Sequence, residues 1–496
     1  MKGIFNKVEK CFNRNETGDA ELLAHFFKDQ ICHSVEEDTW FVFNGRYWQE
    51  DKKQPVTNLV SEDVAECYNR LAGEYFKLYD GAEDNPNAEI ARERQKRAFA
   101  LRSTHRIKAV LKRAADHPDL LTTADDWQVS AWDLPVNNGI VNLKDGSFRP
   151  SKPEDYIRCP CPVDWQGSDH PAPQFEKFVS SIFDGNEDIV KSVQRILGYA
   201  LTGQQTEHIM PILVGSGGNG KDTLIKIVQR VLGELAGPVG EEIMISSRNN
   251  SAASNIASTL RFKRIAYVSE TKDGAYLDSS RVKLLTGGGK LQAKQLYKDP
   301  ISFEQQHTLF LMTNDKPRIN SEDDAIWRRI LLIEFPLSFT DDPKLPNQRK
   351  ADKYLSSKLE AELSGILAWL VRGCLDWQQQ GLSPCKAILD ATLDYRDSED
   401  LIGQFIEDTM IVKADAKISL SLFYRYYEEW ASINGLRALS KIRLGKKIER
   451  RFTKERLTID GKQEWYWLGV ETKPANLPDG LTWEELNEIN KGNEIK

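Results

Sequence analysis

The chain has 496 residues, too many for one ordinary hydrophobic core, and this length predicts about three domains. Apolar residues make up 40% and charged residues 28%, a composition typical of a soluble globular protein. The sequence has no run of about 18 apolar residues, and its first residues are too polar for a secretory signal, so we expect a cytoplasmic protein without membrane contacts. The net charge of −7 excludes a protein that coats nucleic acid with its whole surface, so any nucleic-acid contact must be local.

The seven cysteines include no C-x-x-C pair, which favours reduced thiols over a disulfide framework. Cys159 and Cys161, with His170 nearby, could form part of a metal site. They lack a fourth ligand and the usual zinc spacing, so ordinary burial is the favoured interpretation.

Residues 1–130 are expected to form a mainly helical domain. The predicted elements are a short helix at 20–31, a hairpin at 39–49 that turns at Asn44-Gly45, and long charge-laced helices at 58–79 and 89–115. We interpret the charged residues of the long helices as solvated faces. No set of paired carboxylates on strands indicates a primase or polymerase module here.

Residues 131–203 are expected to combine short strands with helices and to lead into a nucleotide-binding core at 204–345. The segment 132–156 has hairpin signals at Asn138-Gly139 and Asp145-Gly146. Two helical faces follow, formed by Phe175, Phe178, Val179, Ile182 and Phe183, and by Ile189, Val190, Val193, Ile196 and Leu197.

A glycine-rich turn at 215–220 lies between an apolar run that predicts a buried strand and a segment with helical periodicity. Glycines let successive N–H groups form a concave nest in front of a helix N-terminus, which is how a chain cradles a polyphosphate. The predicted phosphate-binding residues are Gly215, Ser216, Gly217, Gly218, Asn219, Gly220, Lys221, Asp222 and Thr223. The bland alternative is a strand-to-helix turn without a ligand.

Lys221 matches the lysine of the G-x-x-x-x-G-K-[ST] pattern and would reach the β and γ phosphates of ATP. The next position should offer a hydroxyl to Mg²⁺, but it is Asp222. Either the hydroxyl is displaced by one residue, to Thr223, or Asp222 meets the metal as a carboxylate.

Three segments in order, NNGIVNLKDG, SVQRILGYALTG and GSGGNGKDT, resemble the superfamily-three helicases of phages, plasmids and poxviruses, which are often fused to a primase. The resemblance covers roughly residues 39–470. It implies an AAA+-like P-loop ATPase core with a parallel sheet, in an α/β fold with an α-rich N-terminal region. It also implies a ring of identical subunits, usually a hexamer, that moves 3′ to 5′ on DNA.

A P-loop requires an acid on a neighbouring strand to help hold Mg²⁺ and polarise the attacking water. Glu270 follows the predicted strand RIAYVS, at the strand end where ligands bind in open α/β sheets. The preceding residue is Ser269, although relatives of this class often have two adjacent acids there. A surface glutamate without a role is the alternative.

Asn314 follows a third predicted strand, HTLFLM, where an amide can bond both the γ phosphate and the attacking water. In this it resembles the family's polar sensor. Between the two strands, the family carries a hairpin that projects into the ring channel, and this makes Lys294 and Lys298 candidates for contacts with single-stranded DNA. Simple solvation of these lysines is the alternative.

Arg328 and Arg329 precede a predicted strand at 330–335, and buried arginines are costly unless they face a partner or an anion. The resemblance implies that one of them reaches the nucleotide of the neighbouring subunit. A salt bridge with Asp323 or Asp324 is the alternative.

Residues 346–400 are expected to form a helical region and linker, including one amphipathic helix at 354–377. Residues 401–470 read as two helices and a hairpin turning at Asp460-Gly461, the order of a winged-helix domain, and 471–496 as a polar tail. Residues 411–470 include thirteen Lys or Arg and seven Asp or Glu, which gives this segment a net charge of +6. The predicted DNA-binding residues here are Lys441, Arg443, Lys446, Lys447, Arg450 and Arg451. A protein-binding wing is the alternative.

These features together predict an ATP- and Mg²⁺-dependent DNA helicase of a phage or plasmid, in the host cytoplasm. Its expected partners are single-stranded and forked DNA, further copies of itself, and a separate primase or polymerase. Two other functions fit the same motifs: an origin-binding initiator that uses ATP as an assembly switch, and a DNA-binding protein with an inactive nucleotide site.

Overall fold

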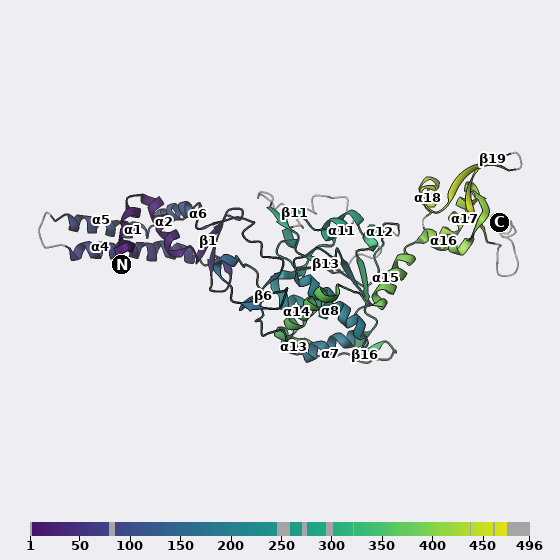
Figure 1. Cartoon of the computed structure of the whole chain (residues 1–496), viewed down its shortest axis with the longest axis horizontal. Coiled ribbons are helices and arrows are strands. Elements are labelled where there is room, and N and C mark those ends of the chain that lie inside the picture. Colours follow the sequence, from purple (N-terminus) through teal and green to yellow (C-terminus); the bar gives the residue numbers. More distant parts are fainter. Residues whose placement is uncertain are drawn as a thin grey trace, which may run out of the picture. The chain divides into compact units, whose positions relative to one another are not determined.

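The computed structural model describes residues 2–78, 85–245, 258–269, 275–293, 301–320, 322–436, 438–459 and 462–473 (Figure 1). The chain forms two compact units. The first comprises 1–319 and 323–393, and the second comprises 320–322 and 394–496. Within the described residues, no helix is both long and apolar enough to cross a membrane.

The first unit begins with a helical region. Its helices are α1 (Lys2–Phe12), α2 (Asn15–Phe27), α3 (Pro55–Asn58), a π-helical segment (Leu59–Val64), α4 (Ala65–Lys77), α5 (Pro86–Ala100) and α6 (Thr104–Ala115). At its centre the fully buried carboxylate of Asp19 accepts hydrogen bonds from the Tyr68 hydroxyl at 2.8 Å and from the guanidinium groups of Arg97 and Arg106 at 3.1 and 2.6 Å. A buried carboxylate is stable only with such partners.

The single helix predicted at 89–115 is two helices. Ser103 caps the second one, since its hydroxyl accepts a hydrogen bond from the Arg106 N–H at 3.3 Å. The break lets Arg97 of α5 and Arg106 of α6 converge on Asp19, a tertiary contact that the local sequence pattern does not reveal.

The first unit also contains two small sheets, and three strands of the first lie between α2 and α3 in the chain. One contains β1 (Ile31–Ser34), β2 (Thr39–Phe43), β3 (Trp48–Glu50) and β4 (Leu121–Thr122), and the other contains β5 (Asp133–Val136), β6 (Gly139–Asn142) and β7 (Phe148–Arg149). The antiparallel pairing of β2 with β3 confirms the predicted hairpin, and Gly45 has the positive φ of +91° that its turn requires. The pairings of β6 with β5 and β7 confirm the two hairpin signals of 132–156.

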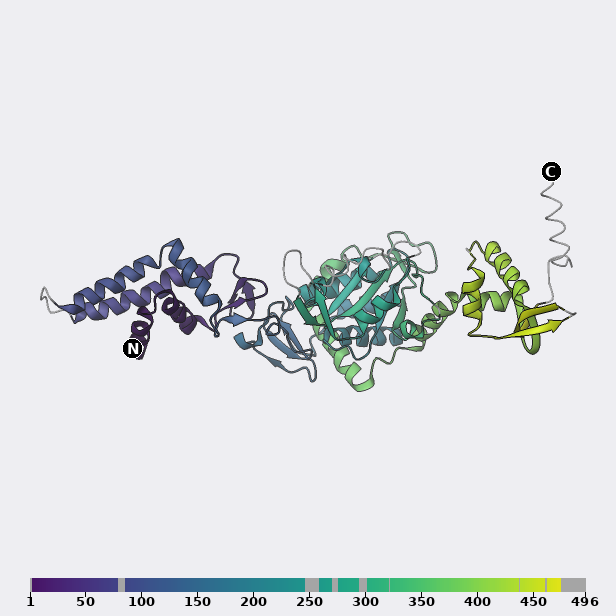
Figure 2. The ribbon, with the colours of Figure 1, turned by 90° about the horizontal axis from the view of Figure 1, so that it is seen from above.

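The central element of the first unit is a purely parallel five-stranded sheet, whose strands lie side by side in Figure 2. Its strands are β8 (Met210–Val214), β9 (Ala236–Pro238), β10 (Ile265–Ser269), β13 (Thr308–Thr313) and β14 (Ile330–Glu334). The order across the sheet is β14-β8-β13-β10-β9. The prediction that the three strands β8, β10 and β13 are neighbours is confirmed, with β13 in the middle.

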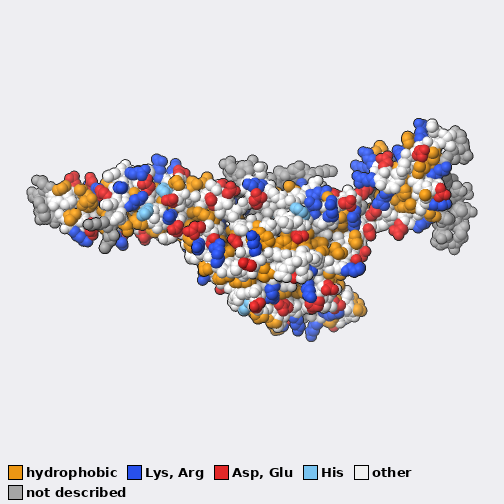
Figure 3. All heavy atoms as spheres, in the orientation of Figure 1, with side chains coloured by type: hydrophobic (Ala, Val, Ile, Leu, Met, Phe, Trp, Pro, Cys, Tyr) orange, Lys and Arg blue, Asp and Glu red, His pale blue; other side chains and the backbone are white. Residues whose placement is uncertain are grey.

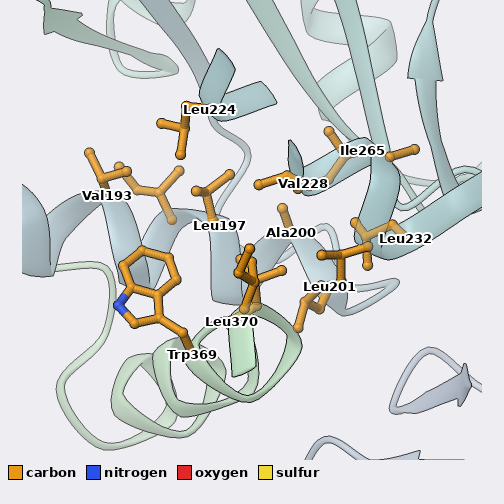
Figure 4. Packing of buried hydrophobic residues seen from close by; sticks show 14 of the residues in the cluster. Val193, Leu197, Ala200, Leu201, Leu224, Val228, Leu232, Ile265, Trp369 and Leu370 are labelled. Carbon is orange, nitrogen blue, oxygen red and sulfur yellow. The ribbon is translucent and has the colours of Figure 1, made fainter. Parts of the chain in front are cut away.

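Helices α7 (Pro173–Ile182), α8 (Glu187–Leu201), α9 (Lys221–Leu232) and α14 (Leu363–Gln380) form the main core together with this sheet. In Figure 4, Leu197 of α8 lies between Leu224 of α9 and Leu370 of α14. The α8–α14 contact is very close: a Cβ added at Gly198 would lie 2.1 Å from the backbone nitrogen of Cys374. A Cβ added at Gly373 of α14 would lie 2.2 Å from the Gln194 carbonyl oxygen, so both helices depend on glycine at their crossing.

The helix predicted at 354–377 is broken into α13 (Leu355–Glu360) and α14. The carboxylate of Glu362, in the break, accepts hydrogen bonds from the Gln174 and Phe175 N–H groups at 3.1 and 2.9 Å. Those N–H groups belong to the first turn of α7, where backbone donors have no partner within the helix. Periodicity cannot predict such a contact because its partners lie almost 190 residues apart.

The remaining elements of the first unit connect these parts. They are α11 (Ser279–Thr286), β11 (Lys290–Ala293), β12 (Ile301–Glu304), α12 (Asp324–Trp327), β15 (Ser338–Thr340) and β16 (Gln348–Lys350). The boundary between the units falls within α15 (Lys386–Ser398).

The second unit contains α16 (Leu401–Thr409), β17 (Met410–Ser419), α17 (Leu420–Ile433), α18 (Lys441–Ile448), β18 (Thr453–Ile459) and β19 (Lys462–Thr472). The strands form an antiparallel sheet in the order β17-β19-β18. The two helices and the β18–β19 hairpin confirm the sequence prediction, but β17 was missed because its register shifts between Val412 and Lys417 and no regular alternation marks it. Phe405 and Phe423 meet edge to face in the core of this unit, with ring centroids 5.2 Å apart.

Candidate nucleotide-binding site

The turn between β8 and α9 is a tight loop whose shape requires glycine. Gly218 and Gly220 have φ values of +75° and +90°, which L side chains rarely adopt. A Cβ at Gly220 would also lie 2.5 Å from the Ile182 side chain. The Phe339 N–H donates to the Gly218 carbonyl at 2.7 Å, so the neighbouring strand β15 fixes the loop from outside.

Lys221 is the first residue of α9, and its side chain is folded back into the loop. Its Nζ donates to the Gly215 carbonyl at 3.0 Å and to Oδ1 of Asn314 at 2.7 Å. The residue is only 4% exposed, and within the described part of the chain it forms no ion pair with a carboxylate. The structure thus brings Lys221, at the start of α9, into direct contact with Asn314, just after β13, and two neutral oxygens hold the buried ammonium group.

The topology explains why the two residues meet. After β8 the chain crosses towards β9 at one edge of the sheet, and after β13 it crosses to β14 at the other edge. The connections therefore diverge between two adjacent parallel strands, and such a switch point opens a crevice at their carboxyl ends, where ligands bind in open α/β sheets.

The loop has the donors that a polyphosphate requires. The N-terminus of α9 points its free N–H groups and its dipole at the loop, which favours an anion. Asn219 is buried, and its side-chain NH₂ group has no hydrogen-bond partner in the described structure, although Oδ1 accepts from the Lys221 N–H at 3.1 Å. A phosphate group fits this set of donors.

The predicted metal ligands are only partly described. Asp222 is exposed and Thr223 is half-buried, both in the first turn of α9, and oxygen donors of this kind suit Mg²⁺. Glu270 lies outside the described residues; Ser269, the last residue of β10, pairs with Met312 of β13. Among the described residues, no group of three or more His, Cys, Asp or Glu could by itself hold a metal ion.

A pocket of about 890 Å³ lies beside the loop, near the upper end of the range of about 300–1,000 Å³ that is usual for small-molecule sites. One wall is the loop itself, with Gly218, Asn219 and Asp222. The facing residues come from α7, β15, β16 and α13, and include Phe178, Ser181, Phe339, Lys350 and Lys358. The sequence does not indicate that these residues share a pocket, because they lie far apart in the chain and match no motif; Phe178 was predicted only as part of an apolar helix face.

Arg328 and Arg329 lie far from this pocket. The Met210 N–H, at the start of β8, donates to the Arg329 carbonyl at 2.6 Å, whereas the glycine-rich loop follows the other end of β8. A five-residue strand is about 16 Å long. The two arginines therefore lie next to the amino end of β8, whereas the glycine-rich loop of the same chain follows its carboxyl end.

The two arginines differ in their contacts. The Arg329 guanidinium donates to the Thr286 hydroxyl at 3.0 Å and to the Ala325 carbonyl at 2.5 Å. Arg328 is exposed, and its Nε donates to the backbone oxygen of Asp324 at 3.2 Å. Asp323, one of the acids considered as a salt-bridge partner, instead pairs with Lys283 at 2.8 Å.

Lys294 and Lys298 lie outside the described residues. The antiparallel pairing of β11 with β12, from Lys290–Glu304 to Ala293–Ile301, confirms that a hairpin leads to the segment that contains them.

The six basic residues predicted to bind DNA in the second unit fall into two groups. Lys447 and Arg450 both pair with Glu322 of the same unit, at 2.9 and 2.7 Å, and Arg451 pairs with Asp400 at 2.6 Å. Lys441, Arg443 and Lys446, all exposed on α18, form no ion pair within the described residues. Three of the six basic residues thus have acidic partners within the second unit and three do not, a difference that composition cannot show.

The cysteine pair is mostly shielded from solvent. Cys161 is fully buried, and burial raises the pKa of its thiol to about 12. Burial, together with the neighbouring Glu234 carboxylate, raises the pKa of Cys159 to about 12 as well. Both thiols are therefore protonated at neutral pH.

Comparison with known proteins shows two family matches. Residues 20–184 match the family described as D5 N terminal like, and residues 213–329 match a family of unknown function (DUF5906). A putative helicase of Acanthamoeba polyphaga mimivirus is 27% identical over 447 residues, covering 84% of this chain and 45% of the relative. A putative helicase of Sputnik virophage is 28% identical over 212 residues, covering 41% of this chain and 27% of the relative.

A putative primase of African swine fever virus is 25% identical over 255 residues, covering 46% of this chain and 25% of the relative. The chain thus spans less than half the length of these relatives, and its similarity is to viral proteins of the primase-helicase type. Among solved structures, the NrS-1 C terminal region aligns with a TM-score of 0.47 at 10% identity, covering 88% of this chain and 95% of that one.

Proposed function

We propose that the chain is an ATP-hydrolysing DNA helicase that assembles into a ring and serves the replication of a virus, phage or plasmid. The observation that carries this proposal is the contact between Lys221 and Asn314 at the switch point of the parallel sheet. The similarity to putative viral helicases and primases supports it independently. We take the sheet, loop and helix α9 as an AAA+-like P-loop core of the superfamily-three type.

In this proposal the residues around the loop bind and position ATP. The backbone N–H groups of the loop hold the phosphates, and Lys221 exchanges its two neutral oxygen partners for phosphate oxygens. Asp222 or Thr223, together with Glu270, holds Mg²⁺, whose charge stabilises the oxygens of the transferred phosphoryl group. Asn314 orients the attacking water, and hydrolysis supplies the free energy for movement.

The adenine base belongs in the adjacent pocket. Phe178 and Phe339 give that pocket apolar ring surface, and Lys350 gives it positive charge, whereas the charge of Lys358 is paired with Asp352 at 2.6 Å. An aromatic face for the base beside a cationic route for the phosphates is the combination that a nucleotide requires.

A second subunit completes the site. Arg328 and Arg329 lie next to the amino end of β8, and the loop of the same chain follows the carboxyl end. Either arginine can therefore contact only the nucleotide of a neighbouring copy. Arg328 is the better candidate, since it is exposed whereas the guanidinium of Arg329 is held by Thr286 and Ala325. Such a head-to-tail contact closes into a ring, for which we propose six subunits.

DNA contacts come from two places. Lys294 and Lys298 of the hairpin bind one strand in the ring channel. The second unit has the element order of a winged-helix domain, namely helix, strand, two helices and two strands, and α18 exposes Lys441, Arg443 and Lys446 at the position of a recognition helix.

The decisive experiment compares Lys221→Ala with Lys226→Ala. Both lysines lie on α9, but Lys226 is exposed and absent from the proposed site, so it controls for loss of charge on the same helix. We expect Lys221→Ala to abolish ATP turnover and displacement of a strand from forked DNA, and Lys226→Ala to retain both. ATP turnover in Lys221→Ala equal to that of the unaltered chain would refute the proposal.

The same assays separate the helicase from its two competitors. An initiator that uses ATP only for assembly would bind and hydrolyse ATP without displacing a strand. A protein with an inactive nucleotide site would show neither turnover nor displacement. Measurement of the particle mass with ATP and single-stranded DNA present tests the ring, and a monomer under these conditions would rule it out.

A further inference from the structure

Helix α6 and the residues just before it form a strongly basic segment in an acidic chain. Between residues 101 and 115 there are five Lys or Arg and no Asp or Glu, whereas the whole chain has a net charge of −7. The first acid after the helix is Asp116, at its C-cap. A local excess of charge of this kind is the electrostatic footprint of an anionic partner.

The structure separates the basic residues that stabilise the fold from those that face solvent. Arg106 points inward and pairs with Asp19 and Glu16. Arg102, Lys108, Lys112 and Arg113 are exposed. Within the described residues, none of these four forms an ion pair, so their charge is available to a partner.

Three of these four side chains belong to α6, and Arg102 lies just before the N-cap of the helix. Lys108 and Lys112 are four residues apart and so lie on the same face of α6, opposite to the buried face that contains Val110 and Ala114. Helix α6 has 12 residues and is about 18 Å long at helical rise, enough for contacts with several successive phosphates. Lys and Arg side chains gather over the part of the N-terminal region that contains α6 (Figure 3).

An exposed aromatic residue lies close in the sequence to the basic residues. Phe99, in the last turn of α5, is 77% exposed, the highest value among the large hydrophobic residues of the described chain. Only four residues separate it from the start of α6 and only two from Arg102. An exposed phenylalanine offers a ring face on which a nucleic-acid base can stack. Removal of that apolar face from water contributes favourably to the free energy of binding.

We propose that Phe99, Arg102, Lys108, Lys112 and Arg113, here called the α6 surface, bind single-stranded DNA. The lysines and arginines contact the phosphates, and the Phe99 ring stacks on an unpaired base. A duplex hides its bases from such a ring, which favours a single strand. A membrane is disfavoured because Phe99 is the one exposed large apolar residue of this surface, whereas interfacial helices bury a whole apolar face in lipid.

The surface makes a contribution to DNA binding that is separate from the ATPase. The test therefore uses the full chain without nucleotide, a fluorescein-labelled 20-nucleotide oligo(dT), and anisotropy measured over a series of salt concentrations. Each phosphate contact to a single strand contributes about 0.7 to the slope of log affinity against log salt. We expect Lys108→Ala/Lys112→Ala to reduce the slope by about 1.4.

The matched control is Lys52→Ala/Lys53→Ala. It removes the same charge from two exposed lysines of the same region, outside the α6 surface, and should leave the slope unchanged. Phe99→Ala should weaken oligo(dT) binding about fivefold or more without changing the slope, since stacking carries no charge. All of these side chains are exposed, so the thermal unfolding midpoint should not change. Lys112→Gln, with an expected change of about 0.7, is the milder variant.

Two results would overturn the proposal. If the slope of Lys108→Ala/Lys112→Ala equals that of the control, the α6 surface does not contact DNA phosphates. If the slope falls but Phe99→Ala binds normally, the surface binds by charge alone and the single-strand specificity is wrong. Neither result depends on ATP hydrolysis, so each differs from failure of the helicase proposal, which the Lys221→Ala assay detects.

Discussion

Replacement of Asn314 by alanine tests the contact on which the proposed ATPase depends. Asn314 is exposed and follows the last residue of β13, so its truncation removes no core packing and should not change stability measurably. It does remove Oδ1, which accepts from the Lys221 ammonium at 2.7 Å. A hydrogen bond to a charged group contributes about 1.5–3 kcal/mol.

If Asn314 bonds the attacking water and the γ phosphate mainly in the transition state, the whole of this free energy is lost from catalysis. The kcat for ATP should then fall about 10- to 150-fold, while KM changes little. Asn314→Asp gives a second, opposite perturbation: it keeps an oxygen next to Lys221 but adds a negative charge, which should hold the lysine as an ion pair and weaken ATP binding.

The assay is steady-state ATP turnover with saturating single-stranded DNA, together with binding of a fluorescent ATP analogue. A kcat for Asn314→Ala within twofold of the unaltered chain would show that the 2.7 Å contact is only a resting position of the lysine. It would refute the assignment of Asn314 to the reaction while leaving Lys221 untouched.

Two further predictions concern the subunit boundary and pH. Arg328→Ala should leave ATP binding unchanged but abolish turnover. Mixing these subunits with Lys221→Ala subunits should restore some turnover, because a site can then combine Lys221 of the first kind of subunit with Arg328 of the second. Arg329→Ala should in addition lower the unfolding temperature, because it breaks the hydrogen bonds to Thr286 and Ala325. No turnover in any mixture would contradict the shared site. Burial lowers the pKa of His307 to about 4, below the usual value of about 6.5. Its contribution to stability is therefore complete above about pH 6.5 and is lost as the pH falls towards 4; at pH 5 the loss is about 2 kcal/mol. Denaturant unfolding at pH 7 and pH 5 should show this loss in the unaltered chain and not in His307→Gln, and equal losses would disprove it.

Local sequence determined the elements that bear the candidate site. A strand, a glycine-rich turn, Lys221 and a helix occur in order because the apolar periodicity and the glycines fix each backbone conformation from within a few residues. The strand before Asn314 and the hairpin around Asn44-Gly45 were predictable for the same reason. These are all cases in which neighbours along the chain specify the structure.

Tertiary structure alone decided which of these residues meet. The contact between Lys221 and Asn314 depends on β13 lying beside β8, and a strand order across a sheet is not encoded in any one segment. The break at Glu362 and the split between α5 and α6 have the same origin, since each is stabilised by partners far along the chain.

The ion pairing of the basic residues was likewise decided by the tertiary structure. Residue counts identified the basic residues of the second unit, but only the fold shows that Arg451 is paired with Asp400 whereas Lys446 forms no ion pair within the described residues. On α6, conversely, a run interpreted as an ordinary solvated face has Arg106 turned inward onto Glu16 and Asp19 of α2, whereas its two lysines form no ion pair within the described residues. Composition fixes how much charge a segment has, and packing decides how much of it remains for a partner, because ion pairs form through space rather than along the chain.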